Sequence, residues 1–174
     1  MHSILPPADP TEPPPAAQGC RQRVEAKLID ALPRHNARPL VFTNGVFDVL
    51  HRGHASYLAC ARDLGAALLV GLNSDVSARS LGKGPGRPLN KQADRALMLA
   101  SLLAVDFVML FDETTPLALL QRVRPDIYVK GGDYDIESLA ETKLVRSWGG
   151  RALALPFIDG YSTTSLVERI RGRA

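Results

Sequence analysis

The sequence feature that most constrains the fold is a regular alternation of short apolar runs with amphipathic helical patterns, which begins after Pro39. Strands that alternate with helices require right-handed crossovers, which favour a parallel sheet covered on both faces. We therefore predict an α/β domain with a doubly wound, Rossmann-like, five-stranded parallel sheet flanked by helices. The predicted strands are 40–43, 67–72, 106–111, 126–129 and 151–155, and the predicted helices are 54–64, 92–104, 116–123, 136–148 and 162–171.

The length of 174 residues suits one domain. Residues 1–19 hold six of the thirteen prolines and no Lys or Arg, so we predict a disordered extension there and a folded domain over 20–174. Apolar residues at helical spacing (Val24, Leu28, Ile29 and Leu32) predict an amphipathic helix over 20–36.

Composition excludes several classes of protein. No apolar stretch approaches the roughly 20 residues that span a bilayer, so we expect no membrane partner. The formal net charge of +3 is small for a nucleic-acid binder. Cys20 and Cys60 form neither a metal-type pair nor a disulfide framework, and a reducing cytoplasm is the simplest setting.

Ligands of doubly wound sheets bind at the carboxyl ends of the strands, at the switch point of the strand order. The turn 44–54 joins the first predicted strand to the first helix and carries His51 and His54 with Gly53 between them. A helix start attracts anions, and two imidazoles three residues apart share one side of a helical turn. They can stabilise charge on a phosphorus under attack. The alternative is a pair of surface histidines that cap a turn.

Two other kinds of site, a Walker phosphate loop and a zinc site, fit this turn less well. A Walker loop would need Gly-Lys-Ser or Gly-Lys-Thr, and zinc would lack a third ligand. Asp48 is a candidate metal ligand or partner for His51, and its plainer role is a turn cap. The predicted nucleotide contacts of this turn are Thr43, Asn44, Gly45, Phe47 and Gly53.

A second helix start follows the last strand, where Ser162, Thr163 and Thr164 precede an amphipathic run. Ser165 with Glu168 matches a capping box, so these residues also have a purely structural explanation. Three consecutive hydroxyl residues exceed what one cap requires. We predict that this helix start faces the first one and binds phosphate.

Basic residues occupy the remaining turns. Lys83 lies in a Gly-Lys-Gly loop that could close over a triphosphate, and its plainer role is a solvent-exposed loop lysine. Arg87, in the same loop beside the histidines, favours the functional role and is a predicted substrate contact. Arg95 is either a substrate contact or an ordinary helix-surface arginine. Lys130 is placed to face a sugar phosphate, and Asp133 to accept a hydrogen bond from a hydroxyl or to fix the turn.

These motifs resemble the nucleotidyltransferases that carry a His-x-Gly-His motif. Residues 42–48 and 51–54 match that motif and its preceding strand. The stretches 72–75, 82–88, 94–95, 129–134, 141–142 and 159–164 are similar to one branch, the D-glycero-β-D-manno-heptose 1-phosphate adenylyltransferases. The resemblance covers roughly residues 38–172.

The resemblance implies a reaction between ATP and the heptose 1-phosphate that gives ADP-heptose and pyrophosphate, for lipopolysaccharide core synthesis. It implies His51, His54 and Lys83 as catalytic residues, and it places the hydroxyls of 162–164 on the β- and γ-phosphates. It also implies Mg²⁺ with the nucleotide and a homo-oligomer. Two alternatives stay open: a cytidylyltransferase that acts on a polyol phosphate, and a nucleotide-sensing module without catalysis.

Overall fold

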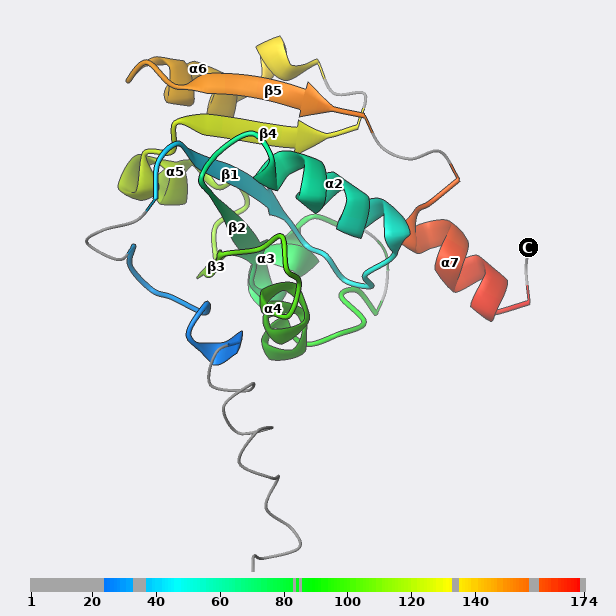
Figure 1. Cartoon of the computed structure of the whole chain (residues 1–174). Helices are drawn as coiled ribbons and strands as arrows, with labels where there is room; N and C mark the ends of the chain where they lie inside the picture. Colours follow the sequence, from blue (N-terminus) through cyan, green and yellow to red (C-terminus); the bar gives the residue numbers. More distant parts are fainter. Residues whose placement is uncertain are drawn as a thin grey trace, which may run out of the picture.

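A five-stranded parallel sheet forms the centre of the computed structural model (Figure 1). The structure describes residues 24–32, 37–82, 84, 86–132, 135–156 and 160–172. The strand order is β3-β2-β1-β4-β5, and every neighbouring pair is parallel. The predicted doubly wound sheet is therefore confirmed. The strands are β1 (Leu40–Gly45), β2 (Ala67–Asn73), β3 (Phe107–Phe111), β4 (Ile127–Gly131) and β5 (Arg151–Leu155).

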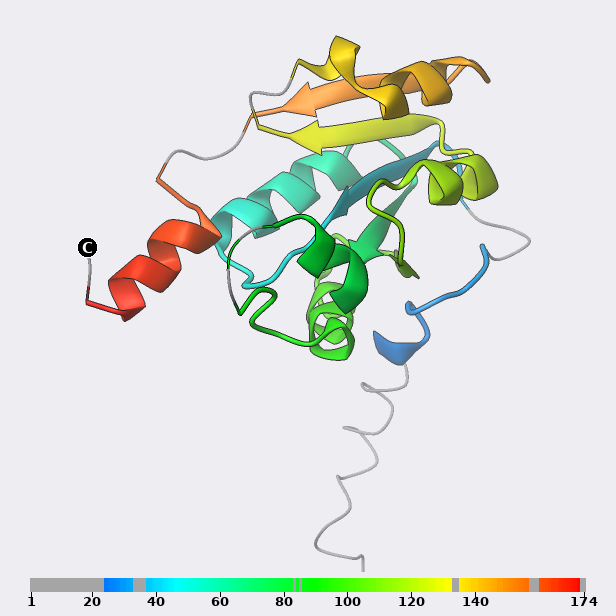
Figure 2. The ribbon, with the colours of Figure 1, turned by 180° about the vertical axis from the view of Figure 1, so that it is seen from behind.

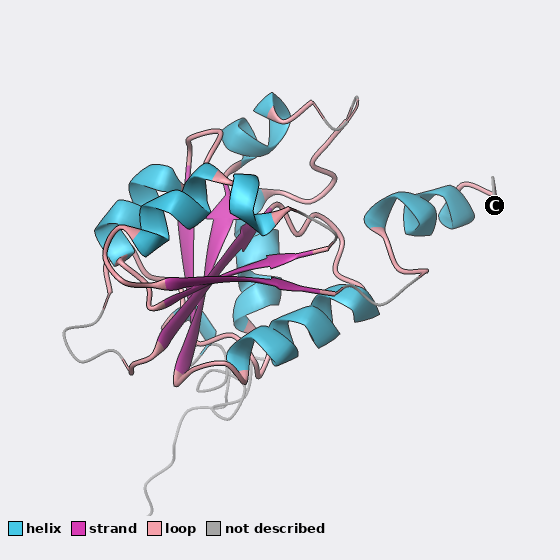
Figure 3. Cartoon of the chain, turned by 90° about the horizontal axis from the view of Figure 1, so that it is seen from above, coloured by secondary structure: helices cyan, strands magenta, loops and turns pink. Residues whose placement is uncertain are grey.

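Helices cover both faces of the sheet, as the view from above shows (Figure 3). Tyr57 and Leu58 of one helix and Leu99 of another pack against one face, and Leu120 and Val145 pack against the other. Figure 2 shows this second face from the front. The helices are α2 (Arg52–Arg62), α3 (Asp75–Ser80), α4 (Gln92–Ala100), α5 (Leu117–Val123), η1 (Ile136–Ser138), α6 (Ala140–Arg146) and α7 (Thr163–Ile170). No helix in the described part of the chain has the length and apolar character needed to cross a bilayer.

Strands β1 and β2 are buried because the sheet is covered on both sides. All seven residues of β2 are buried. In β1, Val41 faces the core under α2 and α4, whereas Phe42 faces the core under α5 and α6. This burial explains why the two strands read as continuous apolar runs rather than as alternating patterns.

Strands β1 and β4 separate at the switch point of the sheet, where the strand order reverses. β1 pairs with β2 over six residues, but its pairing with β4 stops at Phe42 and Tyr128. The hydroxyl of Tyr57, from α2, lies 2.7 Å from Oγ1 of Thr43 and donates to the carbonyl of Val129 at 3.2 Å. One buried side chain thus links the diverging strands and fixes α2 above them.

The predicted N-terminal helix is wrong over the part that the structure describes. Only Val24 and Glu25 are helical, and Leu28 pairs with Val108 at the edge of β3. The amide of Ile29 donates to the carbonyl of Val108 at 3.0 Å. An edge strand offers unpaired backbone groups, and this long-range pairing prevails over the local helical spacing. The predicted extension over 1–19 lies outside the described residues and stays a prediction.

Besides shifts of one or two residues at the ends of elements, three larger differences from the prediction occur. The short helix α3 was not predicted, and α4 ends at Ala100 instead of residue 104. The helix predicted over 136–148 is divided into η1 and α6, because Leu139 has an extended backbone (φ −72°, ψ 136°). These changes leave the order of strands and turns intact.

Candidate active site

Two helix starts meet at one cavity of about 310 Å³. His51 and His54 come from the start of α2, and Ser162, Thr163 and Thr164 come from the start of α7. The first amides of a helix have no partner within the helix, so each start presents free donors and a positive dipole end. The cavity therefore combines two anion-binding helix ends with two imidazoles. The other lining residues are Val46, Phe47, Asp48, Ala78, Arg87, Pro88 and Tyr161.

The two histidine rings stack on each other. Their centroids are 3.9 Å apart, with 21° between the ring planes, and the Phe47 ring meets His54 edge-on at 5.2 Å. The Nδ1 atom of His51 is buried and has no hydrogen-bond partner among the described residues. Burial lowers the pKa of His51 below its ordinary value of 6.5, so the ring is predominantly neutral at pH 7. A bound polyanion would favour its protonated form.

Gly53 makes room for this arrangement. A Cβ atom at position 53 would lie 3.1 Å from Cε1 and Nδ1 of the His51 ring and 3.1 Å from Cβ of Tyr161. Contacts this short would push the imidazole or the approach to α7 aside. The glycine of the His-x-Gly-His motif thus lets the histidine ring and the second helix start come close together.

The start of α7 is held by contacts with the start of α2. Nη1 of Arg52 donates to the Tyr161 hydroxyl at 3.4 Å, and the guanidinium lies 5.7 Å from the centre of the tyrosine ring. Thr163 Oγ1 donates to the carbonyl of Val49 at 3.4 Å. Ser162 is the N-cap, and its Oγ accepts the amide of Ser165 at 3.0 Å. The capping box predicted at Ser165 is wrong, because the helix begins three residues earlier.

Asp48 and Arg87 form an ion pair at the cavity wall, with 2.7 Å between Oδ2 and Nη1. Oδ1 of Asp48 accepts the amides of Leu89 at 2.7 Å and Asn90 at 3.0 Å. Burial would raise the pKa of Asp48, but these amides and the Arg87 guanidinium outweigh burial and hold it below its usual value. The carboxylate is ionised and holds the turn in place.

These contacts also test whether Asp48 fits a metal ion. Both of its oxygens already accept hydrogen bonds from the protein. Among the described residues, no group of three or more His, Cys, Asp or Glu side chains could hold a metal ion. The side chains in this part of the chain do not fit a protein-built metal site, and Asp48 has the turn-capping role that the sequence also allowed.

Comparison with known proteins identifies the family to which the chain with this cavity belongs. The family model described as cytidylyltransferase-like matches residues 42–169, a range that contains both helix starts. A D-beta-D-heptose 1-phosphate adenylyltransferase of Bordetella bronchiseptica (strain ATCC BAA-588 / NCTC 13252 / RB50) is 60% identical over 134 residues, which are 77% of this chain and 83% of that protein. The chain belongs to this family of nucleotidyltransferases.

A longer relative and one solved structure agree with that membership, and a second solved structure shares the fold alone. The bifunctional protein HldE of Syntrophotalea carbinolica (strain DSM 2380 / NBRC 103641 / GraBd1) is 50% identical over 87% of this chain, which covers 31% of that protein. The crystal structure of the lipopolysaccharide core biosynthesis protein from Thermoplasma volcanium GSS1 superposes with a TM-score of 0.58 at 28% identity, over 71% of this chain and 98% of that one. Pantothenate synthetase from Thermus thermophilus shares the fold (TM-score 0.54, 16% identity, 84% of this chain and 69% of that one).

Several predicted contacts of this nucleotidyltransferase do not line the cavity. Thr43 is fully buried, and its hydroxyl bonds to Tyr57. Asn44 lies on the other face of the sheet, where its Oδ1 accepts from Lys130 Nζ and the Tyr128 hydroxyl, each at 3.3 Å. Gly45 lies against the ring of Phe47. A Cβ atom at position 45 would lie only 3.0 Å from Cε2 of that ring. Direct contact with a substrate stays a prediction for Asn44, Gly45 and Lys130.

Arg95 corrects the sequence interpretation. It is only 2% exposed, and its guanidinium donates to protein carbonyls and to Asp75. It is therefore neither a substrate contact nor a helix-surface arginine. Lys83 and Asp133 lie outside the described residues. Tyr161 was missed, although its position directly before three hydroxyl residues was a usable signal.

Proposed function

We propose that this chain transfers the adenylyl group of ATP to D-glycero-β-D-manno-heptose 1-phosphate, giving ADP-heptose and pyrophosphate for lipopolysaccharide core synthesis. The observation that carries the proposal is the shared cavity, in which stacked histidines face a row of hydroxyls across two helix starts. The 60% identity to a heptose 1-phosphate adenylyltransferase favours this acceptor and ATP over a polyol phosphate and CTP.

The reaction is an in-line displacement at the α-phosphorus. A phosphate oxygen of the sugar phosphate forms the new P–O bond, while the bond between the α-phosphorus and the bridging oxygen breaks and pyrophosphate leaves with the electron pair. Catalysis then consists of positioning and charge stabilisation. His51 and His54 donate hydrogen bonds to the α-phosphoryl oxygens, whose negative charge grows in the transition state. No protein nucleophile is required.

The remaining groups bind the two substrates. Ser162, Thr163 and Thr164, with the first amides of α7, bind the β- and γ-phosphates. Arg87 faces the same cavity, and Lys83 supplies a further cation to the triphosphate. We assign Lys130 and Asp133 to the sugar phosphate. Mg²⁺ carried on the phosphate oxygens of ATP would neutralise part of their charge. We further propose a cytoplasmic homo-oligomer.

The direct test is a pyrophosphate-release assay with ATP or CTP and either the heptose 1-phosphate or glycerol 3-phosphate. We expect turnover with ATP and the heptose 1-phosphate only. Turnover with CTP and the polyol phosphate would replace the proposal with the cytidylyltransferase alternative. ATP binding without pyrophosphate release from any sugar phosphate would support a nucleotide sensor.

A further inference from the structure

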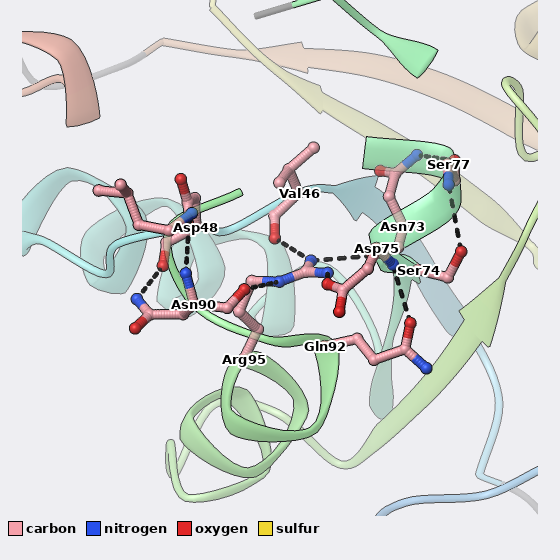
Figure 4. A network of polar contacts seen from close by, with 10 residues as sticks. Val46, Asp48, Asn73, Ser74, Asp75, Ser77, Asn90, Gln92 and Arg95 are labelled. Carbon is pink, nitrogen blue, oxygen red and sulfur yellow. Dashed lines mark hydrogen bonds and ion pairs between the residues drawn. The ribbon is translucent and has the colours of Figure 1, made fainter. Parts of the chain in front are cut away.

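Arg95 lies beneath the turn that leads into α2, and its side chain is fully buried (Figure 4). Its Nε donates to the carbonyl of Asn90 at 3.1 Å, and its Nη1 donates to the carbonyls of Val46 at 2.7 Å and Asn73 at 2.8 Å. Its Nη2 pairs with Oδ1 of Asp75 at 2.7 Å. One guanidinium therefore joins the turn after β1, the end of β2, the start of α3 and the segment before α4.

Only an arginine can make this set of contacts. A guanidinium presents five N–H donors in a rigid planar fork, whereas a lysine ammonium is a single point with three donors. A buried carbonyl that loses its donor destabilises the folded protein, because it has given up its hydrogen bonds to water and gains none in return. The geometry thus depends on the shape of the side chain as well as on its charge.

A second set of bonds fastens the same turn two residues further on. The side-chain amide of Asn90 donates to the carbonyl of Asp48, and the Asn90 backbone amide donates to the Asp48 carboxylate (Figure 4). Arg95 in turn binds the Asn90 carbonyl. The turn is therefore held at Val46 by Arg95 directly and at Asp48 by Asn90, which Arg95 also holds.

The residue between these two anchors carries the link to the histidines. Phe47 has a positive φ of 46°, a conformation that is strained for a non-glycine residue and persists only where the surroundings impose it. In this conformation the Phe47 ring packs against the ring of His54. Loosening either anchor would let the turn relax and would move the surface on which His54 rests.

We propose that Arg95 is a positioning residue that holds the 46–48 turn, so that Phe47 seats the stacked histidines beside Arg87. Its effect on turnover rests on the proposed function, whereas its effect on the histidine rings does not. The second cavity, of about 330 Å³, is lined by Arg95 and Met98 together with residues of the turn. Shortening the side chain at position 95 would enlarge this cavity.

The test compares Arg95→Lys with Arg79→Met, a control at an exposed position of α3 that lies outside this set of contacts. Side-chain NMR without nucleotide follows the His54 resonances and their cross-peak with the Phe47 ring. Pyrophosphate release is measured at a temperature where each variant is folded. For Arg95→Lys we expect shifted His54 resonances, a weakened cross-peak and a kcat about 10–100-fold lower. We expect the KM for ATP to change less than about threefold. The control should match the wild type.

A purely stabilising role would lower the melting temperature of Arg95→Lys but leave the His54 resonances and kcat unchanged, and that outcome would overturn the proposal. Addition of millimolar guanidinium to Arg95→Ala should restore part of the kcat, since the cation can occupy the vacated position. If Arg95→Lys fails to fold, Asn90→Ala replaces it, because it removes the side-chain bond to the Asp48 carbonyl but keeps Arg95 and the backbone bonds of residue 90. Unchanged His54 resonances in Asn90→Ala would also contradict the proposal. An inactive wild type with the expected NMR changes would reject the proposed function alone.

Discussion

The two helix starts at the cavity are built very differently. The start of α2 continues into a helix with Tyr57, Leu58 and Ala61 buried, and the turn before it is fastened by Asp48 and Arg95. Helix α7 has no buried residue and projects from the body of the molecule (Figures 1 and 3). Segments with few buried contacts open at a low free-energy cost. The histidine side of the site is thus prebuilt, whereas the hydroxyl side has room to adjust to the phosphate that we propose it binds.

The largest expected effect comes from the prebuilt side. His54→Ala should lower kcat by on the order of 10²–10³-fold, because it removes a donor that acts on the transition state. The KM for ATP should change little, since the phosphates keep both helix starts. Pyrophosphate release under saturating substrates measures this. Full turnover in His54→Ala would remove His54 from the catalytic role.

The second effect is on stability. Asp48→Ala removes the acceptor of two backbone amides and leaves Arg87 without its partner, so the free energy of unfolding should fall by about 3 kcal/mol. Urea unfolding at pH 7 measures the loss. An Arg62→Ala variant, which loses the more exposed ion pair with Asp106, is the control and should lose far less.

The same carboxylate predicts a pH dependence. The pKa of Asp48 is lowered on folding, so its contribution to stability is present above the unfolded pKa of about 3.9 and is lost as the pH falls through the folded value. The difference in unfolding free energy between wild type and Asp48→Asn should therefore shrink below about pH 4. A difference that stays constant from pH 7 to pH 3 would show that Asp48 does not titrate as described.

A smaller effect is expected on the adjustable side. Tyr161→Ala removes the contact with Arg52 and should raise the KM for ATP by about three- to tenfold, with kcat within about twofold, because more of the cost of ordering α7 then falls on phosphate binding. Tyr161→Phe keeps the ring over the guanidinium and should stay near the wild type. Equal losses in both variants would show that the hydroxyl, and not the ring, holds the helix.

The smallest effect is local. Ser162→Ala removes the N-cap and should destabilise the first turn of α7 by about 1 kcal/mol, without a measurable change in global unfolding. Amide hydrogen exchange at Ser165 and Leu166 should quicken, whereas exchange in α2 should not change. An equal loss in the unfolding free energy of the whole chain would mean that α7 is coupled to the core more tightly than its contacts indicate.

The sheet and the two helix starts were predictable because the relevant residues are neighbours in sequence. His51, Gly53 and His54 follow a buried strand after a short turn, and the carboxyl end of such a strand is where doubly wound folds bind ligands. Arg95 was not predictable in the same way. Its carbonyl partners Val46 and Asn73 lie 49 and 22 residues away, and no local pattern distinguishes a buried arginine from one that binds substrate.

The N-terminal segment shows the same limit. Val24, Leu28, Ile29 and Leu32 have helical spacing, yet Leu28 pairs with β3. Short apolar patterns fit a strand as well as a helix, and the choice depends on a partner strand about 80 residues further along the chain, as Leu28 and Val108 show. The prediction failed where a distant backbone, and not the local periodicity, decided the conformation.

The pairing of Leu28 with Val108 also bears on how the chain can be shortened. A truncated chain that begins at Arg38 would keep every helix and strand named above, but it would expose the backbone groups of the edge strand β3. An exposed edge strand of this kind can pair with the edge strand of another molecule and cause aggregation. Light scattering during refolding should therefore rise for that shortened chain, while a version that begins at Val24 should refold without turbidity.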